Sequence, residues 1–301
     1  MVFSGLVGLK EDLEDRLRPI RAQLFPRQLL LELQDDSLKG QVLRGSGPEA
    51  VSIDLPLPPL TCLDGQPLEK EPLGDLIGDL LVRNGLFDAL VLASLPEGAA
   101  QWRVLDWPID AIPDDPIAAL RTIDPPLNLA VPLSEATIDL RPLPGTSPRM
   151  LLAVAPRKLV DDWIDVFNLA GVQLERLAPA QSCRLAAVAS LLEVSPPEEL
   201  TVLIHPLPAG ARLLLLRRTE PVFDWPLPQD DDDDLVREVS RCVSFCRRRD
   251  RSIRRLRLLL SAPLPSQDNL QDALGVRAEI LTPEPFGSLA LQGLAMVESA
   301  R

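Results

Sequence analysis

Tyrosine is absent from the sequence, histidine occurs once, and aromatic residues make up only 4% of the 301 residues. Because single-stranded nucleic acids stack on aromatic side chains, this scarcity disfavours a nucleic-acid-binding protein. The net charge of −13 disfavours it further, since an acidic surface repels phosphate backbones and anionic lipid head groups. We therefore expect no nucleic-acid partner and no direct insertion into a membrane.

Long apolar runs are also missing. No stretch approaches the roughly 20 apolar residues that a membrane-spanning helix requires. The first residues, MVFSGLVGLKEDLEDRLRPI, carry Lys10 and several acids where a secretion signal would be continuously apolar. These features predict a cytoplasmic location.

Cysteine is scarce, and its four residues are spread along the chain. Cys242 and Cys246 stand one helical turn apart, so they could begin a metal clip. A zinc site would need two further ligands, and the single histidine, His205, is distant in sequence. We interpret the cysteines as buried apolar side chains with reduced thiols, and we predict no metal site.

Proline is abundant, and its 31 residues mark the ends of predicted elements. Residues 4–24 have the pattern of an amphipathic helix, which predicts an N-terminal helical extension over 1–27. Strand-like runs follow at 28–33, 39–44 and 50–55, and then come a helix over 73–84 and an apolar strand over 89–93.

The same order recurs in the second half of the chain. Strands are predicted at 201–205, 211–217 and 222–227, a helix over 232–249 and a strand over 256–260, before a final helix, strand and helix. Three antiparallel strands followed by a helical crossover to a parallel strand describe a ribonuclease H-like unit. Two such units predict an α/β protein with the two-lobed actin-like fold and a cleft between the lobes.

A different module lies between the two units. Its strand (150–155), helix (157–170) and strand (172–177) predict an inserted α/β subdomain with its helices on one face of a small sheet. The predicted division is a first lobe over 28–100, an inserted subdomain over 101–178, a helix returning to the first lobe over 179–198, and a second lobe over 199–301.

Part of this module resembles a known family. The segment LSEATIDLRPLP…PRMLLAVAPRKLVDDWIDVFNLAGVQLERLAPAQSCRLAAVASLL and the C-terminal PEPFGSLALQGLAMV are similar to PilM, the actin-like proteins of type IV pilus assembly. The resemblance implies an adaptor that binds the cytoplasmic N-terminal tail of PilN, an inner-membrane protein, and connects it to motor components. It also implies a peripheral location at the inner membrane.

The family's peptide groove lies between the first lobe and the inserted subdomain. The resemblance therefore suggests Leu133, Ile138 and Leu140 as partner-binding residues. The cytoplasmic domain of the type II secretion protein GspL shares this architecture and is the nearest alternative. Full-length GspL continues into a transmembrane helix, whereas this chain ends at Arg301, so we expect PilM rather than GspL.

An actin-like ATPase needs glycine-bearing hairpins, because backbone N–H groups must approach the phosphates. In the first hairpin, ELQDDSLKG, Lys39 stands at the family's lysine position. Glu32 replaces the expected aspartate, however, and Gln34 replaces the expected glycine. The side chain of Gln34 would obstruct a phosphate, and the neighbouring acids would repel it.

The second hairpin, TVLIHPLPAGARL, departs further from the pattern. His205 stands for the aspartate and Leu207 for the glycine, between prolines that lack an N–H donor. At the adenosine turn, Ala262 and Pro263 replace the expected pair of glycines. We therefore predict a pseudo-ATPase with no catalytic residues and no cofactor. The alternative, which Lys39 supports, is a working ATPase that binds ATP and magnesium through divergent loops.

Two charged runs remain. The acids at 230–234 lack the spacing of a calcium loop, and we interpret them as complementing the N-terminal end of the predicted helix. The arginines between 247 and 257 could form a basic patch for an acidic partner or for lipid head groups, although a solvated face is the simpler interpretation.

Overall fold

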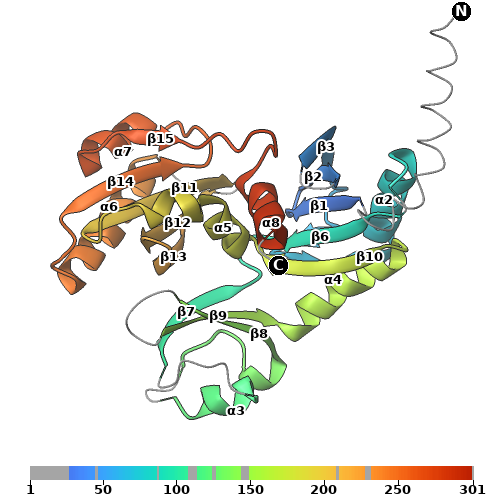
Figure 1. Cartoon of the computed structure of the whole chain (residues 1–301), viewed down its shortest axis with the longest axis horizontal. Helices are drawn as coiled ribbons and strands as arrows, with labels where there is room; N and C mark the ends of the chain where they lie inside the picture. The colour runs from blue at the N-terminus through green and yellow to red at the C-terminus, as the bar shows by residue number, and fades with distance from the viewer. Residues whose placement is uncertain are drawn as a thin grey trace, which may run out of the picture.

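The computed structural model describes residues 27–44, 47–86, 88–107, 114–123, 127–143, 149–207, 210–227 and 232–299. Two five-stranded sheets, one from each half of the chain, lie on either side of a pair of helices, and a three-stranded sheet lies beneath them in the view of Figure 1. The predicted N-terminal extension falls outside the described residues except for Arg27. Among the described helices, none is long and apolar enough to cross a membrane.

The first sheet has the strand order β10-β6-β1-β2-β3. Strands β1, β2 and β3 form an antiparallel meander, and helix α2 then leads to β6, which pairs with β1 in parallel. A short hairpin of β4 and β5 precedes α2. The bounds are β1 Gln28–Leu33, β2 Ser37–Arg44, β3 Gly47–Pro56, β4 Cys62–Leu63, β5 Gln66–Pro67, α2 Lys70–Arg83 and β6 Leu90–Leu95.

The second sheet repeats this arrangement in the order β13-β12-β11-β14-β15. Its first three strands are antiparallel, and α6 leads to β14, which pairs with β11 in parallel. This repeat confirms the duplicated unit predicted from the sequence. The bounds are β11 Glu199–Leu207, β12 Gly210–Arg217, β13 Glu220–Leu227, α6 Asp232–Arg249, β14 Arg255–Leu260, α7 Gln267–Leu274 and β15 Ala278–Ile280.

Both faces of each sheet are covered, which explains the unbroken apolar runs of the central strands. In β1, Leu29 and Leu31 belong to the core shared with α2, whereas Leu30 packs on the opposite face. In β11, Val202 faces the core shared with α6 and Leu203 faces the other side. All four cysteines are buried, and Cys242 and Cys246 lie in the core between α6 and the second sheet.

The inserted subdomain is smaller than predicted. Its antiparallel sheet has the order β7-β9-β8. The next two elements, α4 and β10, belong to the first lobe, because β10 pairs with β6 in parallel. A strand–helix–strand pattern does not reveal which sheet its second strand joins, so the predicted boundary at residue 178 is wrong and the subdomain ends with β9. The bounds are β7 Gln101–Asp106, α3 Pro116–Arg121, η1 Leu133–Glu135, β8 Ala136–Pro142, β9 Arg149–Pro156, α4 Arg157–Leu169 and β10 Gln173–Pro179.

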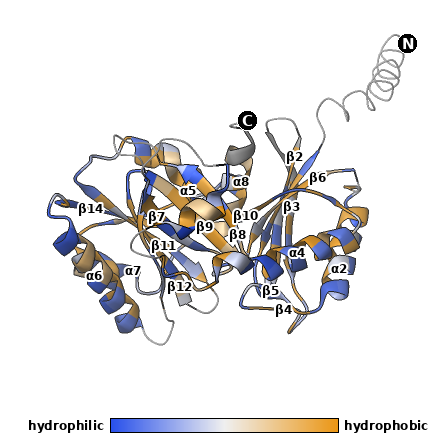
Figure 2. Cartoon of the chain, turned by 90° about the horizontal axis from the view of Figure 1, so that it is seen from below, coloured by the Kyte–Doolittle hydropathy of each residue, from blue (hydrophilic) through white to orange (hydrophobic). Residues whose placement is uncertain are grey.

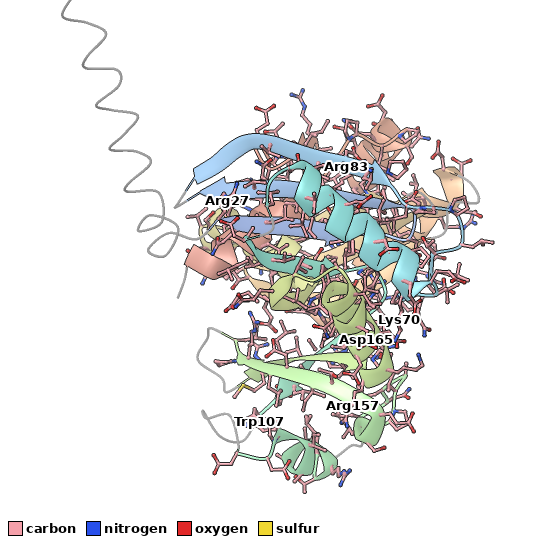
Figure 3. All side chains as sticks on the ribbon, turned by 90° about the vertical axis from the view of Figure 1, so that its right-hand side faces the viewer. Arg27, Lys70, Arg83, Trp107, Arg157 and Asp165 are labelled. Carbon is pink, nitrogen blue, oxygen red and sulfur yellow. The ribbon has the colours of Figure 1, made fainter. Side chains whose placement is uncertain are left out.

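Side-chain contacts fix α4 to the first lobe. Lys70, at the start of α2, forms ion pairs with Asp162 at 2.6 Å and with Asp165 at 2.8 Å, and Figure 3 shows Lys70 beside Asp165. The buried indole of Trp163 donates a hydrogen bond of 2.8 Å to the carbonyl oxygen of Gly65. These contacts join α4 to α2 and to the β4–β5 hairpin.

Two helices, α5 (Ala180–Glu193) and α8 (Leu289–Ser299), pack against each other between the lobes (Figure 1). Cys183 of α5 packs on the first sheet, whereas Val188 and Leu192 pack on the second. The sequence predicted a helix returning to the first lobe, and in the structure α5 packs on the second lobe as well as on the first. Gly293 of α8 lies directly on α5, where an added Cβ atom would overlap the carbonyl oxygen of Cys183.

We predict that Gly293→Ala separates α5 from α8 and lowers the free energy of unfolding by about 3 kcal/mol, at the upper end of overpacking costs. Gly287→Ala is the matched control, because a Cβ atom added there would have no neighbour within 4 Å and only the φ of 75° is unfavourable. That strain costs about 1 kcal/mol. Urea unfolding measures the free energy of unfolding of both variants. Equal losses of unfolding free energy in the two variants would contradict the packing described for Gly293.

Candidate functional site between the lobes

The two sheets present matching polar residues on the faces turned toward α5 and α8. In the first sheet Glu32 of β1 pairs in register with Lys39 of β2. In the second sheet His205 of β11 pairs in register with Arg212 of β12. All four share the strand face that is opposite to α2 or α6, as the alternation of their apolar neighbours shows. The two hairpins therefore offer equivalent positions to a common space between the lobes.

The centre of this space is the guanidinium of Arg184, which α5 carries into it. The side chain of Arg184 is 4% exposed and forms an ion pair with Glu97, which follows β6. Its Nη2 atom also lies 3.9 Å from Oε1 of Glu32. Burial lowers the pKa of Arg184 to about 10, and Glu32 and Asp224 oppose that shift, so the group remains charged at neutral pH. One buried cation thus lies between two carboxylates.

Arg212 has a partner of its own. Its Nε and Nη2 atoms donate hydrogen bonds of 2.6 and 2.8 Å to the two carboxylate oxygens of Asp224 on β13. A bidentate pair of this kind has a fixed geometry and leaves little of either charge for a ligand. Lys39 has no ion-pair partner among the residues that the structure describes.

The first hairpin is closed by its own side chains. The backbone N–H of Gln34 donates to the carbonyl oxygen of Ser37 at 3.0 Å. The side-chain amide of Gln34 reaches back to Oε1 of Glu32 at 3.2 Å, and the hydroxyl of Ser37 donates to Gln34 at 2.9 Å. Asp35 accepts a hydrogen bond of 2.8 Å from the backbone N–H of Gly65. The turn is therefore covered where a glycine would leave its backbone open.

The second hairpin continues as strand through Leu207, which pairs with Gly210. Nδ1 of His205 lies 2.6 Å from the hydroxyl of Ser261, just after β14. Ala262 and Pro263 follow at the bend beyond Ser261, at the position predicted for an adenosine turn. The structure thus brings Glu32, Lys39 and His205 together around Arg184.

Burial lowers the pKa of His205 well below its ordinary value, and the positive charges of Arg184 and Lys39 lower it further. Its Nε2 atom is inaccessible to solvent and has no hydrogen-bond partner in the described part of the chain. The imidazole is therefore neutral at physiological pH. It contributes a hydrogen bond to Ser261 and no charge.

The three predicted partner-binding residues lie in the subdomain. Leu140 is 6% exposed and packs with Leu120 of α3, and Leu133 and Ile138 pack against the same core. The burial of Leu140 excludes it as a direct contact in this conformation. The opposite face of β8 is exposed and carries Thr137, Asp139 and Arg141. The sequence analysis did not reveal this alternation, because it placed no strand at these residues.

Comparison with solved structures supports the arrangement of lobes and subdomain. A chain of the PilM–PilN type IV pilus biogenesis complex superposes with a TM-score of 0.70 and 18% identity, covering 90% of this chain and 98% of that one. A protein from Bacteroides thetaiotaomicron with an actin-like ATPase fold and unknown function gives 0.57 and 8% identity, with coverages of 89% and 95%. The chain has the actin-like fold.

The cytoplasmic domain of EpsL, an inner-membrane component of the type II secretion system of Vibrio cholerae, gives a TM-score of 0.50 and 12% identity, covering 91% of this chain and 96% of that one. No family model matches the sequence, and no curated protein matches it. The superpositions, rather than these low sequence identities, show the actin-like fold, and the predicted two-lobed architecture is confirmed.

The residues present do not fit the nucleotide and magnesium ion that the actin-like fold can hold. A triphosphate between the hairpins would meet the carboxylates of Glu32 and Glu97, which Arg184 already pairs. The Gln34 side chain covers the first turn, and Pro206 has no N–H to offer at the second. Of the residues predicted as remnants of a nucleotide site, only Lys39 retains a suitable charge. Arg184 was missed in the sequence, although an arginine within the apolar helix AQSCRLAAVASLLE was an available signal.

The neutral His205 predicts a pH dependence of stability. Its folded-state pKa is depressed, so below the unfolded pKa of about 6.5 only the unfolded chain takes up this proton. We expect a loss of about 1.4 kcal/mol in unfolding free energy between pH 7.5 and 5.5. Urea unfolding at these pH values should show the loss in the wild type. The His205→Asn variant keeps a hydrogen-bond acceptor for Ser261 and has the same carboxylates as the wild type. Its unfolding free energy should therefore fall by about 1.4 kcal/mol less over this pH range. An identical pH dependence in the two proteins would contradict the assignment of the loss to His205.

Proposed function

We propose that this chain is a cytoplasmic adaptor of type IV pilus assembly, which binds the cytoplasmic N-terminal tail of a PilN-like inner-membrane protein and does not hydrolyse ATP. The observation that carries the proposal is the likeness to a chain of the PilM–PilN complex, which extends over nearly the whole of both chains. Residues outside the two lobes, including the inserted subdomain, take part in that likeness. The adaptor role would place the chain peripherally at the inner membrane, where motor components could join it.

The ion pairs of Arg184 and Arg212 support the second half of the proposal, the absence of ATP hydrolysis. Arg184 and Arg212 are each neutralised by carboxylates of the same chain, so neither is available to a triphosphate. Removing a partner from a buried ion pair typically costs about 3–5 kcal/mol, because a charge is left uncompensated. A nucleotide that displaced Glu97 or Glu32 would incur such a cost. The buried charges in this space are thus compensated within the chain and need no nucleotide to neutralise them.

We place the tail along the exposed face of β8, between the subdomain and the first lobe. Thr137, Asp139 and Arg141 point away from the subdomain core and are exposed. Arg141 is near enough to α5 for its charge to act on the thiol of Cys183, and its only ion-pair partner among the described residues is Asp139. This face can offer both charges and a strand edge to an extended peptide.

The test is isothermal titration calorimetry with a synthetic peptide of the N-terminal cytoplasmic tail of a PilN-like protein from the same organism. We expect a dissociation constant in the micromolar range that Mg-ATP does not change. Arg141→Glu should weaken binding about tenfold, the equivalent of about 1.4 kcal/mol. Arg121→Glu on α3 makes the same charge change on the far side of the subdomain, and its effect should be less than about twofold.

Failure of the peptide to bind would overturn the adaptor role. Equal losses in the two variants would overturn the placement along β8. A second candidate is the cytoplasmic part of a type II secretion protein, which the likeness to EpsL supports. It would be favoured if the tail of a type II secretion partner bound in place of the PilN-like tail.

A further inference from the structure

A groove of about 340 Å³ lies on the outer side of the second lobe, between β13 and α6. Figure 1 shows these two elements next to each other, and Figure 2 shows α6 at the outer edge of the lobe. Phe223 faces the core under α6, whereas Asp224 lies on the sheet face that carries Arg212. The groove therefore opens away from the space around Arg184. It is lined by Phe223, Trp225, Arg241, Cys242, Phe245 and Arg248.

Three aromatic rings form the apolar part of this groove. Phe223 stacks on Trp225 with centroids 5.8 Å apart and tilts against Phe245 at 6.2 Å. Phe223 is half-buried, but Trp225 is 41% exposed and Phe245 is 45% exposed. Leaving large aromatic surfaces in water forfeits about 25 cal/mol per Å² of apolar area. In a chain with so few aromatic residues, two adjacent exposed rings indicate a surface that is covered by something else.

The rim of the groove is positively charged. Arg241 forms an ion pair of 2.6 Å with Glu238, whereas Arg248 has no ion-pair partner among the residues that the structure describes. Arg247 and Arg249 are also exposed at this end of α6. Arginines near a helix C-terminus complement the helix dipole, and that accounts for their position along α6. It does not account for exposed aromatic rings beside Arg248.

We propose that this groove binds an acidic segment of a partner protein, with a large apolar side chain inserted between Trp225 and Phe245 and carboxylates paired with Arg248 and Arg241. The complementarity is local, since the chain as a whole carries a net charge of −13. Buried aromatic and arginine side chains are also the usual centres of binding energy in protein interfaces.

Two features select this occupant. Pro221 and Pro226 lie on β13, an edge strand, and lack the N–H groups that an added strand would need, so side chains rather than strand pairing provide the contacts. The aromatic rings line a concavity rather than a convex surface, which favours a protein side chain over a lipid bilayer. The inference does not depend on the pilus role, because the groove lies on the face of β13 opposite to Asp224 and Arg212, and β8 contributes no residue to it.

The probe is a short fluorescein-labelled peptide with a central leucine–phenylalanine pair flanked by aspartates, compared with its lysine-flanked counterpart. Fluorescence polarisation with the full chain should show saturable binding of the acidic peptide alone. Arg248→Glu should weaken this binding about tenfold, as expected for a rim charge that pairs directly. Arg247→Glu makes the same charge change one residue away, outside the groove, and should change the affinity by less than about twofold.

Phe245→Ser provides a second test that changes no charge. Because Phe245 is 45% exposed, the variant should keep the wild-type melting temperature. It should nevertheless lose most of its affinity for the acidic peptide. Three results would overturn the proposal. The first is that the acidic peptide does not bind, and the second is that the Arg247 and Arg248 variants lose equal affinity. The third is that the wild type binds phosphatidylglycerol vesicles but not the peptide, and that Arg248→Glu abolishes this vesicle binding. The last result would assign the groove to a lipid surface instead.

Discussion

A buried guanidinium must be neutralised, and in this protein that requirement fixes α5, the helix that lies between the lobes, to the first lobe. Arg184 projects from α5 into the space between the sheets, where Glu97 and Glu32 provide the opposite charges. The position of α5 depends in turn on close packing against α8 at Gly293. The charges of Arg184 and Lys39, together with burial, keep His205 neutral. The site, the junction helices and the arrangement of the lobes therefore depend on one another.

Much of the fold could be predicted because its central strands are buried on both faces and its elements repeat in the same order. The runs at Gln28–Leu33 and Glu199–Leu207 are apolar enough to be recognised without any alignment. The position of β10 could not be predicted, since pairing with β6 rather than β9 is a tertiary choice that local sequence does not encode. Strand β8 was not predicted, because prolines and charges surround it in the sequence. The alternation that buries Leu140 and exposes Arg141 was therefore missed as well.

The candidate site shows the same division. Single replacements such as Gln34 for glycine could be recognised by position in the hairpin, because the chemistry of phosphate binding demands a bare backbone there. The residues that neutralise the buried charges could not be recognised from the sequence. Glu97 and Arg184 are distant in sequence and come into contact only because α5 lies between the lobes. The side chain of Gln34 covers the first turn, and carboxylates of the same chain form ion pairs with Arg184 and Arg212. In the function that we propose, a fold that can hold a nucleotide serves as a scaffold whose outer faces are available to partners.

The most direct test of this account is the melting temperature of the full chain with and without about 1 mM Mg-ATP. A ligand present at 100 times its dissociation constant adds about 2.7 kcal/mol to stability, which in a chain of this size raises the melting temperature by about 4 °C. Because carboxylates of the same chain already pair with Arg184 and Arg212, and Gln34 covers the first turn, we expect a change of less than about 1 °C. A rise of several degrees that grows with nucleotide concentration would contradict the account and show that the space around Arg184 still accepts ATP.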